Sequence, residues 1–314
     1  LGFWGKIKKP FFVLAPMADV TDAAFRRIIA KYGKPDVMYT EFVSTDGLLS
    51  PGRAKLIKDF IYTEAERPIV AQIFGTKPEN FEKVAAELVE MGFDGIDINM
   101  GCPDRSLVKS GSCAWLIDNP ELAVEIVHAT KRGAGKLPVS VKTRLGTKKN
   151  VLESWLPKLL EAEPAVVTLH ARTAKEQSLV PAHWEQIARA VEIARGSGTL
   201  IVGNGDVKDL EDARLKARDT GVDGIMLGRA IFGNPFLFNE LVNISDIPLK
   251  QKLEILLEHA RLFEELLGDT KNFAIMRKHF GAYVKGFDGA AAVRAELMEA
   301  RDARDMEKIV NSVR

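Results

Sequence analysis

For its first 240 residues the sequence alternates between short apolar, β-branched runs and amphipathic segments. This rhythm limits the possible fold more than any other feature, because apolar runs of this kind are typical of parallel strands joined by helical crossovers. Eight strand–helix units of roughly 30 residues each predict an α/β fold, a parallel sheet closed into a (β/α)8 TIM barrel. The predicted strands cover residues 11–17, 37–43, 69–75, 95–101, 139–145, 166–172, 200–207 and 224–230.

Helical periodicity fills the intervals between these strands, at residues 22–32, 78–91, 121–132, 151–161, 184–195 and 209–220. An open doubly wound sheet is the rival arrangement, but no G-x-G-x-x-G follows the first strand, and the closed barrel is favoured. After Pro235 the pattern becomes helical without strands, at 249–267, 272–283 and 290–298. We therefore expect a barrel domain of residues 1–240 and a small all-helical domain of residues 241–314.

Composition limits where the protein can act and which ligands it can bind. No apolar run approaches the 18 residues of a membrane span, and two cysteines make no disulfide framework, so a cytoplasmic location is expected. Cys102 and Cys113, with five scattered histidines, offer no metal-ligand spacing, and no metal is expected. The net charge of +1 neither supports nor excludes a nucleic-acid partner, since a local basic patch is sufficient.

Polar residues follow nearly every predicted strand. In TIM barrels the reactive side chains lie at the carboxyl ends of the strands, where these residues would meet. Buried polar groups without partners cost a few kcal/mol each, so their recurrence at strand ends indicates a functional site. The strand-end residues are Ala15, Pro16, Met17, Gln72, Asn99, Cys102, Lys142, Arg144, His170, Arg172, Asn204, Asp206, Gly228 and Arg229.

Cys102 follows the fourth predicted strand in a Gly-Cys-Pro sequence, beside Asn99. A thiol on such a loop can give or take a proton. The alternative is a small buried hydrophobic residue, which is how most cysteines behave. That second interpretation fits Cys113 better, because it lies among small residues suited to close packing.

The last two strand ends suit a phosphate group. Backbone N–H groups at Gly203–Asp206 and Gly228 could bind it, and Arg229 could add a charge-assisted contact. The alternative is that these glycines form simple turns between strand and helix and bind no phosphate. Lys142 and His170 suit the polar edge of a flavin, although a salt bridge and a core histidine would also account for them.

Together these segments resemble the tRNA-dihydrouridine synthases, a family that depends on FMN. The likeness covers the whole barrel in order and continues more weakly into the tail. It rests on residues 15–22, 72–75, 99–103, 141–146, 170–173, 203–207 and 228–235, and on 277–279 with Tyr283.

The resemblance implies an FMN enzyme that reduces the C5–C6 double bond of specific uridines in tRNA, with NADPH as the electron source. Cys102 would protonate C5 of the uracil. By position in the family motifs, Ala15, Pro16 and Met17 would lie beneath the flavin ring, and Gln72, Lys142 and His170 would contact its polar edges. Asn204, Asp206, Gly228 and Arg229 would hold the ribityl chain and phosphate. Asn99, Arg144 and Arg172 would orient the base.

The tail supplies a candidate tRNA surface, because no acidic residue lies between Thr270 and Asp288. Cations can hold phosphates there, and we expect Arg277 and Lys278 to do so. The span carries Lys271, Arg277, Lys278, His279 and Lys285, interleaved with Phe273, Phe280, Tyr283 and Phe287. For the aromatic residues, packing in the helical core is the favoured interpretation.

Two other functions stay open. An FMN barrel oxidoreductase acting on a free small molecule, like dihydroorotate or dihydropyrimidine dehydrogenases, would use the same flavin residues without needing the tail. A non-enzymatic RNA-binding barrel would need no proton donor. The sequence also departs from its relatives, with Asp104-Arg105-Ser106 in place of common lysines and Cys113 in place of a common glycine. Which of the two thiols reacts is therefore open.

Overall fold

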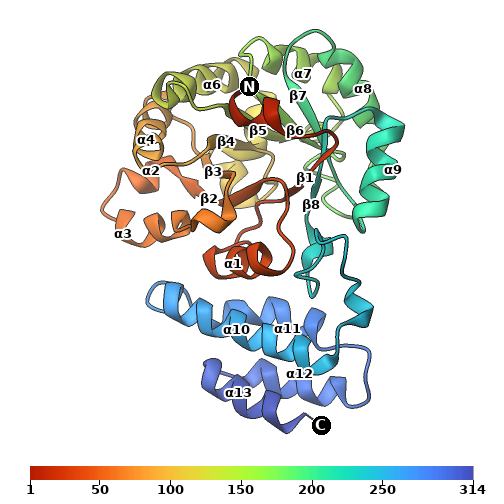
Figure 1. The fold of residues 1–314 in the computed structure, drawn as a ribbon. Coiled ribbons are helices and arrows are strands. Elements are labelled where there is room, and N and C mark those ends of the chain that lie inside the picture. Colours follow the sequence, from red (N-terminus) through yellow and green to blue (C-terminus); the bar gives the residue numbers. More distant parts are fainter. Residues whose placement is uncertain (314) are drawn as a thin grey trace.

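The computed structural model describes residues 1–313 and contains eight parallel strands joined by helical segments (Figure 1). Most strand residues are buried, as expected for parallel strands covered on both faces. The strands are β1 (Phe11–Leu14), β2 (Met38–Ser44), β3 (Ile69–Phe74), β4 (Gly95–Met100), β5 (Val139–Arg144), β6 (Val166–His170), β7 (Leu200–Asn204) and β8 (Gly224–Leu227).

The sheet closes on itself. Its strand order is β1-β8-β7-β6-β5-β4-β3-β2, so β1 and β2 are the two strands left to meet. They meet just before β2, where Val13 pairs with Val37 and the N–H of Leu14 donates to the carbonyl of Val37 at 3.2 Å. The TIM-barrel prediction is therefore confirmed, and the open doubly wound sheet is excluded.

The six helices predicted around the barrel are all present. Two begin where an aspartate side chain accepts an N–H from three residues further on, Asp22 from Phe25 and Asp209 from Asp212. Short helices that the periodicity did not single out follow β2 and β4. The barrel helices are α1 (Ala23–Tyr32), α2 (Thr45–Leu48), α3 (Arg53–Leu56), α4 (Pro78–Glu90), α5 (Arg105–Lys109), α6 (Pro120–Ala134), α7 (Leu152–Leu160), α8 (Trp184–Ala194) and α9 (Leu210–Thr220).

The amino end of the barrel is filled by apolar side chains. Trp4, on the 3-10 helix η1 (Gly2–Lys6), is 1% exposed and its ring centroid lies 5.4 Å from that of Phe11. Val13, Tyr39 and other inward-facing residues pack in the same cluster. A barrel packed in this way leaves its carboxyl end for binding and chemistry.

The tail consists of α10 (Leu249–Leu267), α11 (Arg277–Tyr283), α12 (Ala290–Glu299) and α13 (Ala303–Ser312). Figure 1 shows these helices stacked beside α1, against which α10 packs. The all-helical tail is confirmed, with α13 as a helix that the sequence analysis missed; the domain boundary at residue 240 stays a prediction. No helix within residues 1–313 is long and apolar enough to cross a membrane.

Candidate active site

The strand register brings the predicted site residues together at the carboxyl end of the barrel. Asn99 on β4 pairs with Lys142 on β5. Arg144 pairs with His170 on β6, which in turn pairs with Asn204 on β7. Residues far apart in the sequence thus form one continuous polar row.

A cavity of about 660 Å³ opens above this row. Every predicted cofactor-binding residue except Gln72 lines it. The lining residues are Ala15, Pro16, Met17, Lys142, His170, Asn204, Gly205, Asp206, Val207, Lys208, Met226, Gly228, Arg229 and Ala230.

The cavity combines apolar and cationic walls. Ala15 to Met17 form an apolar wall, while Lys142, Lys208 and Arg229 contribute positive charge. Burial, together with neighbouring Arg144, lowers the pKa of Lys142 to about 8. Within residues 1–313 the Lys142 ammonium has no hydrogen-bond or ion-pair partner. An apolar slot with an unpartnered ammonium at one edge fits a flavin ring, and further cations fit its phosphate.

A second cavity, of about 620 Å³, holds Cys102. His170 and Arg229 line both cavities, so the two adjoin. Four arginines make the second cavity strongly cationic. Its lining residues are Cys102, Pro103, Asp104, Arg105, Arg144, His170, Arg172, Gln177, Ser178 and Arg229.

Asn99 and Arg144 hold the loop that carries Cys102. Asn99 Oδ1 accepts the N–H groups of Gly101 and Cys102, both at 3.0 Å. Arg144 Nε donates to the carbonyl of Gly101 at 2.7 Å. Both side chains were predicted to orient the base; the structure shows them bound to the loop, and their contact with a base stays a prediction.

Gln72 lies below the cavities and is fully buried. Its Oε1 accepts from Asn99 Nδ2 at 3.2 Å, and its Nε2 donates to Asp97 at 2.7 Å. Gln72 thereby supports Asn99 from within the barrel. The flavin contact predicted for it stays a prediction.

The two cysteines interact, which the sequence analysis did not predict. A hydrogen bond from the Cys113 thiol lowers the pKa of Cys102 to about 6, against the effect of burial. The pKa of buried Cys113 is raised well above its usual range by the same contact and by burial. Cys113 has φ +55°, a left-handed conformation that glycine adopts readily. Cys113 is a small buried residue, as expected, but it also lowers the pKa of Cys102.

His170 is held neutral. Burial, with Arg144 and Lys142 close by, keeps its pKa well below the usual range. Arg144 Nη1 lies 3.4 Å from Nδ1 of the imidazole. Since a guanidinium can only donate, we assign the proton to Nε2, which is then free to donate to a ligand.

Asp206 joins the arginines across the mouth of the barrel. It forms ion pairs with Arg172 and with Arg229, the latter at 2.7 Å. Arg172 is 2% exposed and its Nε donates to the carbonyl of Val180 at 2.6 Å. Its Nη1 is buried without a hydrogen-bond partner among residues 1–313. The predicted phosphate residue Asp206 thus orients two cations.

Comparison with known proteins identifies the family. A family model described as Dihydrouridine synthase (Dus) matches residues 13–313. "Probable tRNA-dihydrouridine synthase" of Staphylococcus aureus (strain MRSA252) is 39% identical to this chain, covering 98% of it and 94% of the relative. "Probable tRNA-dihydrouridine synthase 2" of Bacillus subtilis (strain 168) is also 39% identical, covering 98% and 95%. The chain belongs to the dihydrouridine synthase family.

Membership of this family confirms the expected enzyme class, a flavin-dependent oxidoreductase acting on CH–CH groups. Solved structures show the same fold at low identity. The old yellow enzyme from Trypanosoma cruzi has a TM-score of 0.52 at 13% identity, covering 76% of this chain and 88% of that one. An amine oxidase from Pseudomonas geniculata N1 has a TM-score of 0.59 at 14% identity, covering 82% and 53%.

Two basic residues of the tail do not lie where the sequence analysis placed them. His279 is fully buried and its ring lies 4.6 Å from that of Phe25 on α1. Lys271 is 14% exposed and forms an ion pair with Glu41 on β2. The prediction that they belong to a basic tRNA surface is wrong, because both are used in packing the tail onto the barrel. Phe280 and Tyr283 are buried, as favoured for the aromatic residues.

The predicted tRNA contacts Arg277 and Lys278 are exposed on α11. Lys278 Nζ lies 3.4 Å from Asp19, in the loop that follows the cavity wall of residues 15–17. The exposed cations of α11 therefore lie close to the cavity that residues 15–17 line.

Asp97 is a polar residue of the site that was not predicted. It is fully buried on β4, where burial raises its pKa to about 6 although Ser140 and Gln72 donate hydrogen bonds to it. A charged residue inside the apolar run 95–100 was the available signal. Within residues 1–313, no three His, Cys, Asp or Glu side chains gather as a metal site.

Proposed function

We propose that this dihydrouridine synthase reduces the C5–C6 double bond of uridines in tRNA, with FMN in the larger cavity and the uracil in the adjoining one. The observation that carries the proposal is the shared boundary of the two cavities. Cys102 lines one, the flavin-sized cavity is the other, and His170 and Arg229 belong to both. A base beside Cys102 would thus lie next to the flavin site.

Different residues of the larger cavity suit different parts of FMN. Ala15, Pro16 and Met17 would lie against the ring, and Lys142 and neutral His170 would bind its polar edge. Gly228, Arg229 and Asn204 would hold the ribityl chain and phosphate, with Asp206 keeping Arg229 in place. When bound, FMN supplies the hydride for C6 of the uracil.

Cys102 would hold a proton at Sγ and deliver it to C5. Hydride addition leaves an enolate-like charge on the uracil, which nearby hydrogen-bond donors can stabilise. Three groups of the cavity can serve: the Arg144 guanidinium, the unpartnered Nη1 of Arg172 and the Nε2–H of His170. We further propose NADPH as the electron source, as the membership of this family suggests.

Residues 241–314 would form the tRNA-binding domain. A uridine must leave its base stack to enter a barrel mouth, which costs a few kcal/mol and favours loop nucleotides. Arg277 and Lys278 lie on the surface that the rest of the tRNA would cross. An enzyme for a free pyrimidine has no need of this surface. A tRNA substrate also agrees with the expected cytoplasmic location.

The test uses the full-length chain reconstituted with FMN. Undermodified tRNA and NADPH are added, and dihydrouridine is measured, with free uridine and dihydroorotate as competing substrates. We expect a bound-flavin spectrum and dihydrouridine in tRNA alone. Absence of flavin binding would overturn the assignment of the larger cavity. Flavin binding with reduction or oxidation of the free pyrimidines only would favour the small-molecule alternative.

A further inference from the structure

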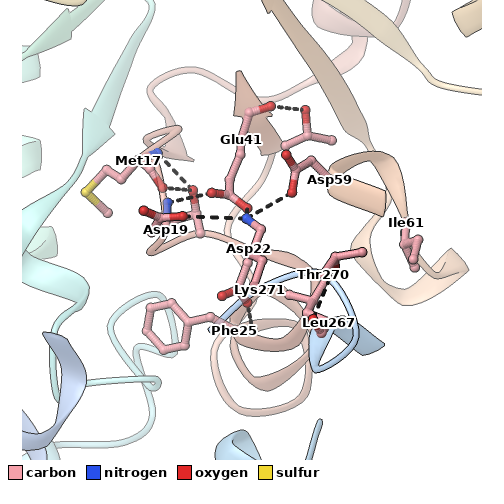
Figure 2. A network of polar contacts seen from close by, with 12 residues as sticks. Met17, Asp19, Asp22, Phe25, Glu41, Asp59, Ile61, Leu267, Thr270 and Lys271 are labelled. Atoms are coloured by element: carbon pink, nitrogen blue, oxygen red, sulfur yellow. Dashed lines mark hydrogen bonds and ion pairs between the residues drawn. The ribbon is translucent and has the colours of Figure 1, made fainter. Parts of the chain in front are cut away.

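Lys271 reaches from the tail into a group of barrel carboxylates (Figure 2). Its Nζ lies 2.6 Å from Glu41 and 2.9 Å from Asp59. All three side chains are largely buried, with exposed fractions of 14%, 5% and 15% respectively. Asp19 lies at the edge of the group, 3.8 Å from Nζ. The tail therefore contributes the cation that neutralises this group.

Glu41 connects Lys271 to the loop that forms a wall of the flavin cavity. One oxygen of the Glu41 carboxylate accepts a hydrogen bond from the Lys271 ammonium, and the other accepts one from the backbone N–H of Asp19 at 2.5 Å. Asp19 has φ +53°, a left-handed conformation that a non-glycine residue keeps only when its surroundings hold it.

The turn around Asp19 is tied to Met17. The N–H groups of Val20 and Thr21 donate to the carbonyl of Met17 at 3.1 and 3.0 Å, and the N–H of Met17 donates to the Thr21 hydroxyl at 2.9 Å. Met17 lines the flavin cavity. A chain of contacts thus runs from Lys271 through Glu41 and the 17–21 turn to the cavity wall.

The ammonium is needed because the carboxylates crowd one another. Burial raises the pKa of Glu41 to about 7; Lys271 opposes this effect, while Asp59 and Asp22 add to it. Removal of the cation would leave Glu41 either neutral or repelled by its neighbours. A repelled carboxylate would turn away from the N–H of Asp19, and a neutral one would accept a weaker hydrogen bond, since bonds to a charged acceptor are about twice as strong. Of these carboxylates, Lys278 contacts only Asp19, and its side chain is half-exposed, so it does not replace Lys271.

We propose that Lys271 is a positioning residue: by neutralising Glu41 it lets this carboxylate hold Asp19, and so fixes the 17–21 turn and the Met17 wall of the flavin cavity. This inference rests on the proposed binding of FMN in that cavity. It makes the tail part of the cofactor site, although none of its residues lines the cavity.

The first test is Lys271→Met in the full-length chain. We expect the dissociation constant for FMN to rise roughly ten- to a hundred-fold, the effect of losing a hydrogen bond to a charged group. In the flavin-free protein the amide of Asp19 should exchange faster with solvent. Lys271→Arg, which keeps the charge, should restore both values.

The matched control is Asp269→Asn. Asp269 forms an ion pair with Lys58 across the same contact between tail and barrel, but has no link to the turn. It should leave FMN affinity and Asp19 exchange unchanged. An equal loss in this variant would overturn the proposal and assign the effect to docking of the tail.

The double variant Glu41→Gln/Lys271→Met covers the case in which Lys271→Met alone does not fold. The side-chain amide that Glu41→Gln introduces would still offer an oxygen to the N–H of Asp19 and would not be repelled by the neighbouring carboxylates, so FMN affinity and slow exchange should return in part, to the level that a neutral acceptor allows. Wild-type values in the single Lys271→Met variant, or no recovery in the double variant, would overturn the proposal. Failure of the wild type to bind FMN would instead refute the proposed function, and the exchange measurement would still test Lys271.

Discussion

The two thiols at the mouth of the barrel have opposite characters. Contact with Cys113 lowers the pKa of the Cys102 thiol, whereas burial and the same contact raise the pKa of Cys113, so Cys102 is the stronger acid of the pair. Cys113 has a left-handed backbone conformation, which a glycine at this position would adopt without strain. A thiol of low pKa releases its proton readily, but it can act as an acid only while it is protonated.

Replacement of the acid should separate flavin binding from chemistry. In Cys102→Ala we expect a normal flavin spectrum and a rate of dihydrouridine formation lower by roughly 10²- to 10⁴-fold, the usual contribution of a positioned acid. Cys113→Ala should stay active. Single-turnover reduction of tRNA measures both variants, and the reverse pattern would assign the acid to Cys113.

The pH profile tests the interaction between the thiols. Since the pKa of Cys102 is lowered to about 6, the protonated fraction falls as pH rises above this value. We expect kcat/KM for tRNA to fall across the range from pH 6 to pH 8. Cys113→Ala removes the hydrogen bond that lowers the pKa, so its profile should shift to higher pH. A profile that is identical in both proteins would contradict this role of Cys113.

At the scale of elements, the loop between β1 and α1 is held from several sides. Glu41 on β2 holds it at Asp19, and Arg26 on α1 holds it at Thr21, whose carbonyl accepts from Nη1 at 2.9 Å. Arg26 also forms an ion pair with Glu66 at 2.8 Å, and both side chains are fully buried. The wall of the proposed flavin cavity is thus anchored in three separate elements: α1, β2 and the 3-10 helix that contains Glu66.

Removal of one partner from this buried pair should destabilise the whole protein. We expect Glu66→Ala to lower the free energy of unfolding by about 3–5 kcal/mol, because it leaves the Arg26 charge buried and uncompensated. Urea unfolding followed by circular dichroism measures the change. Glu64→Ala removes the exposed pair with Arg67 nearby and should unfold like the wild type. Similar midpoints for both variants would contradict the importance of burial.

The sequence predicted the elements well because alternation and burial are local patterns. Their ends were less predictable: the strand expected at 11–17 ends at Leu14, and that at 224–230 ends at Leu227. Beyond these points the chain leaves the sheet to build the cavities, while its composition stays apolar. Long-range pairing was not visible at all. Lys271 looked like a surface cation because its partner Glu41 lies 230 residues away in the sequence.

At the scale of the whole molecule, barrel and tail each carry cations at or near the mouth of the barrel. Arginines line the cavity of Cys102, and the exposed Arg277 and Lys278 lie on α11, where Lys278 lies 3.4 Å from Asp19. Phosphates along a bound tRNA could therefore contact both parts while one uridine enters the barrel.

Arg277→Ala should weaken tRNA binding and reduce the slope of log affinity against log salt by about 1, as expected for loss of one phosphate contact. Filter binding between 50 and 200 mM salt, roughly the range over which such contacts are lost, measures the slope. Arg261→Ala is the control, since Arg261 pairs with Glu307 inside the tail. An unchanged slope in Arg277→Ala would place the tRNA elsewhere.

Closure of the barrel by β1 and β8 also sets an order of events during synthesis. Phe11 pairs with Gly224, and Leu14 with Leu227, so the first strand emerges long before its neighbour is translated. At bacterial and eukaryotic elongation rates the wait is roughly 10–40 s, during which an apolar strand edge lies open to wrong partners. Met17 and Arg229, which both line the proposed flavin cavity, come together only after that interval, and Lys271 arrives later still. The nascent chain therefore acquires its cofactor site among the last features it forms.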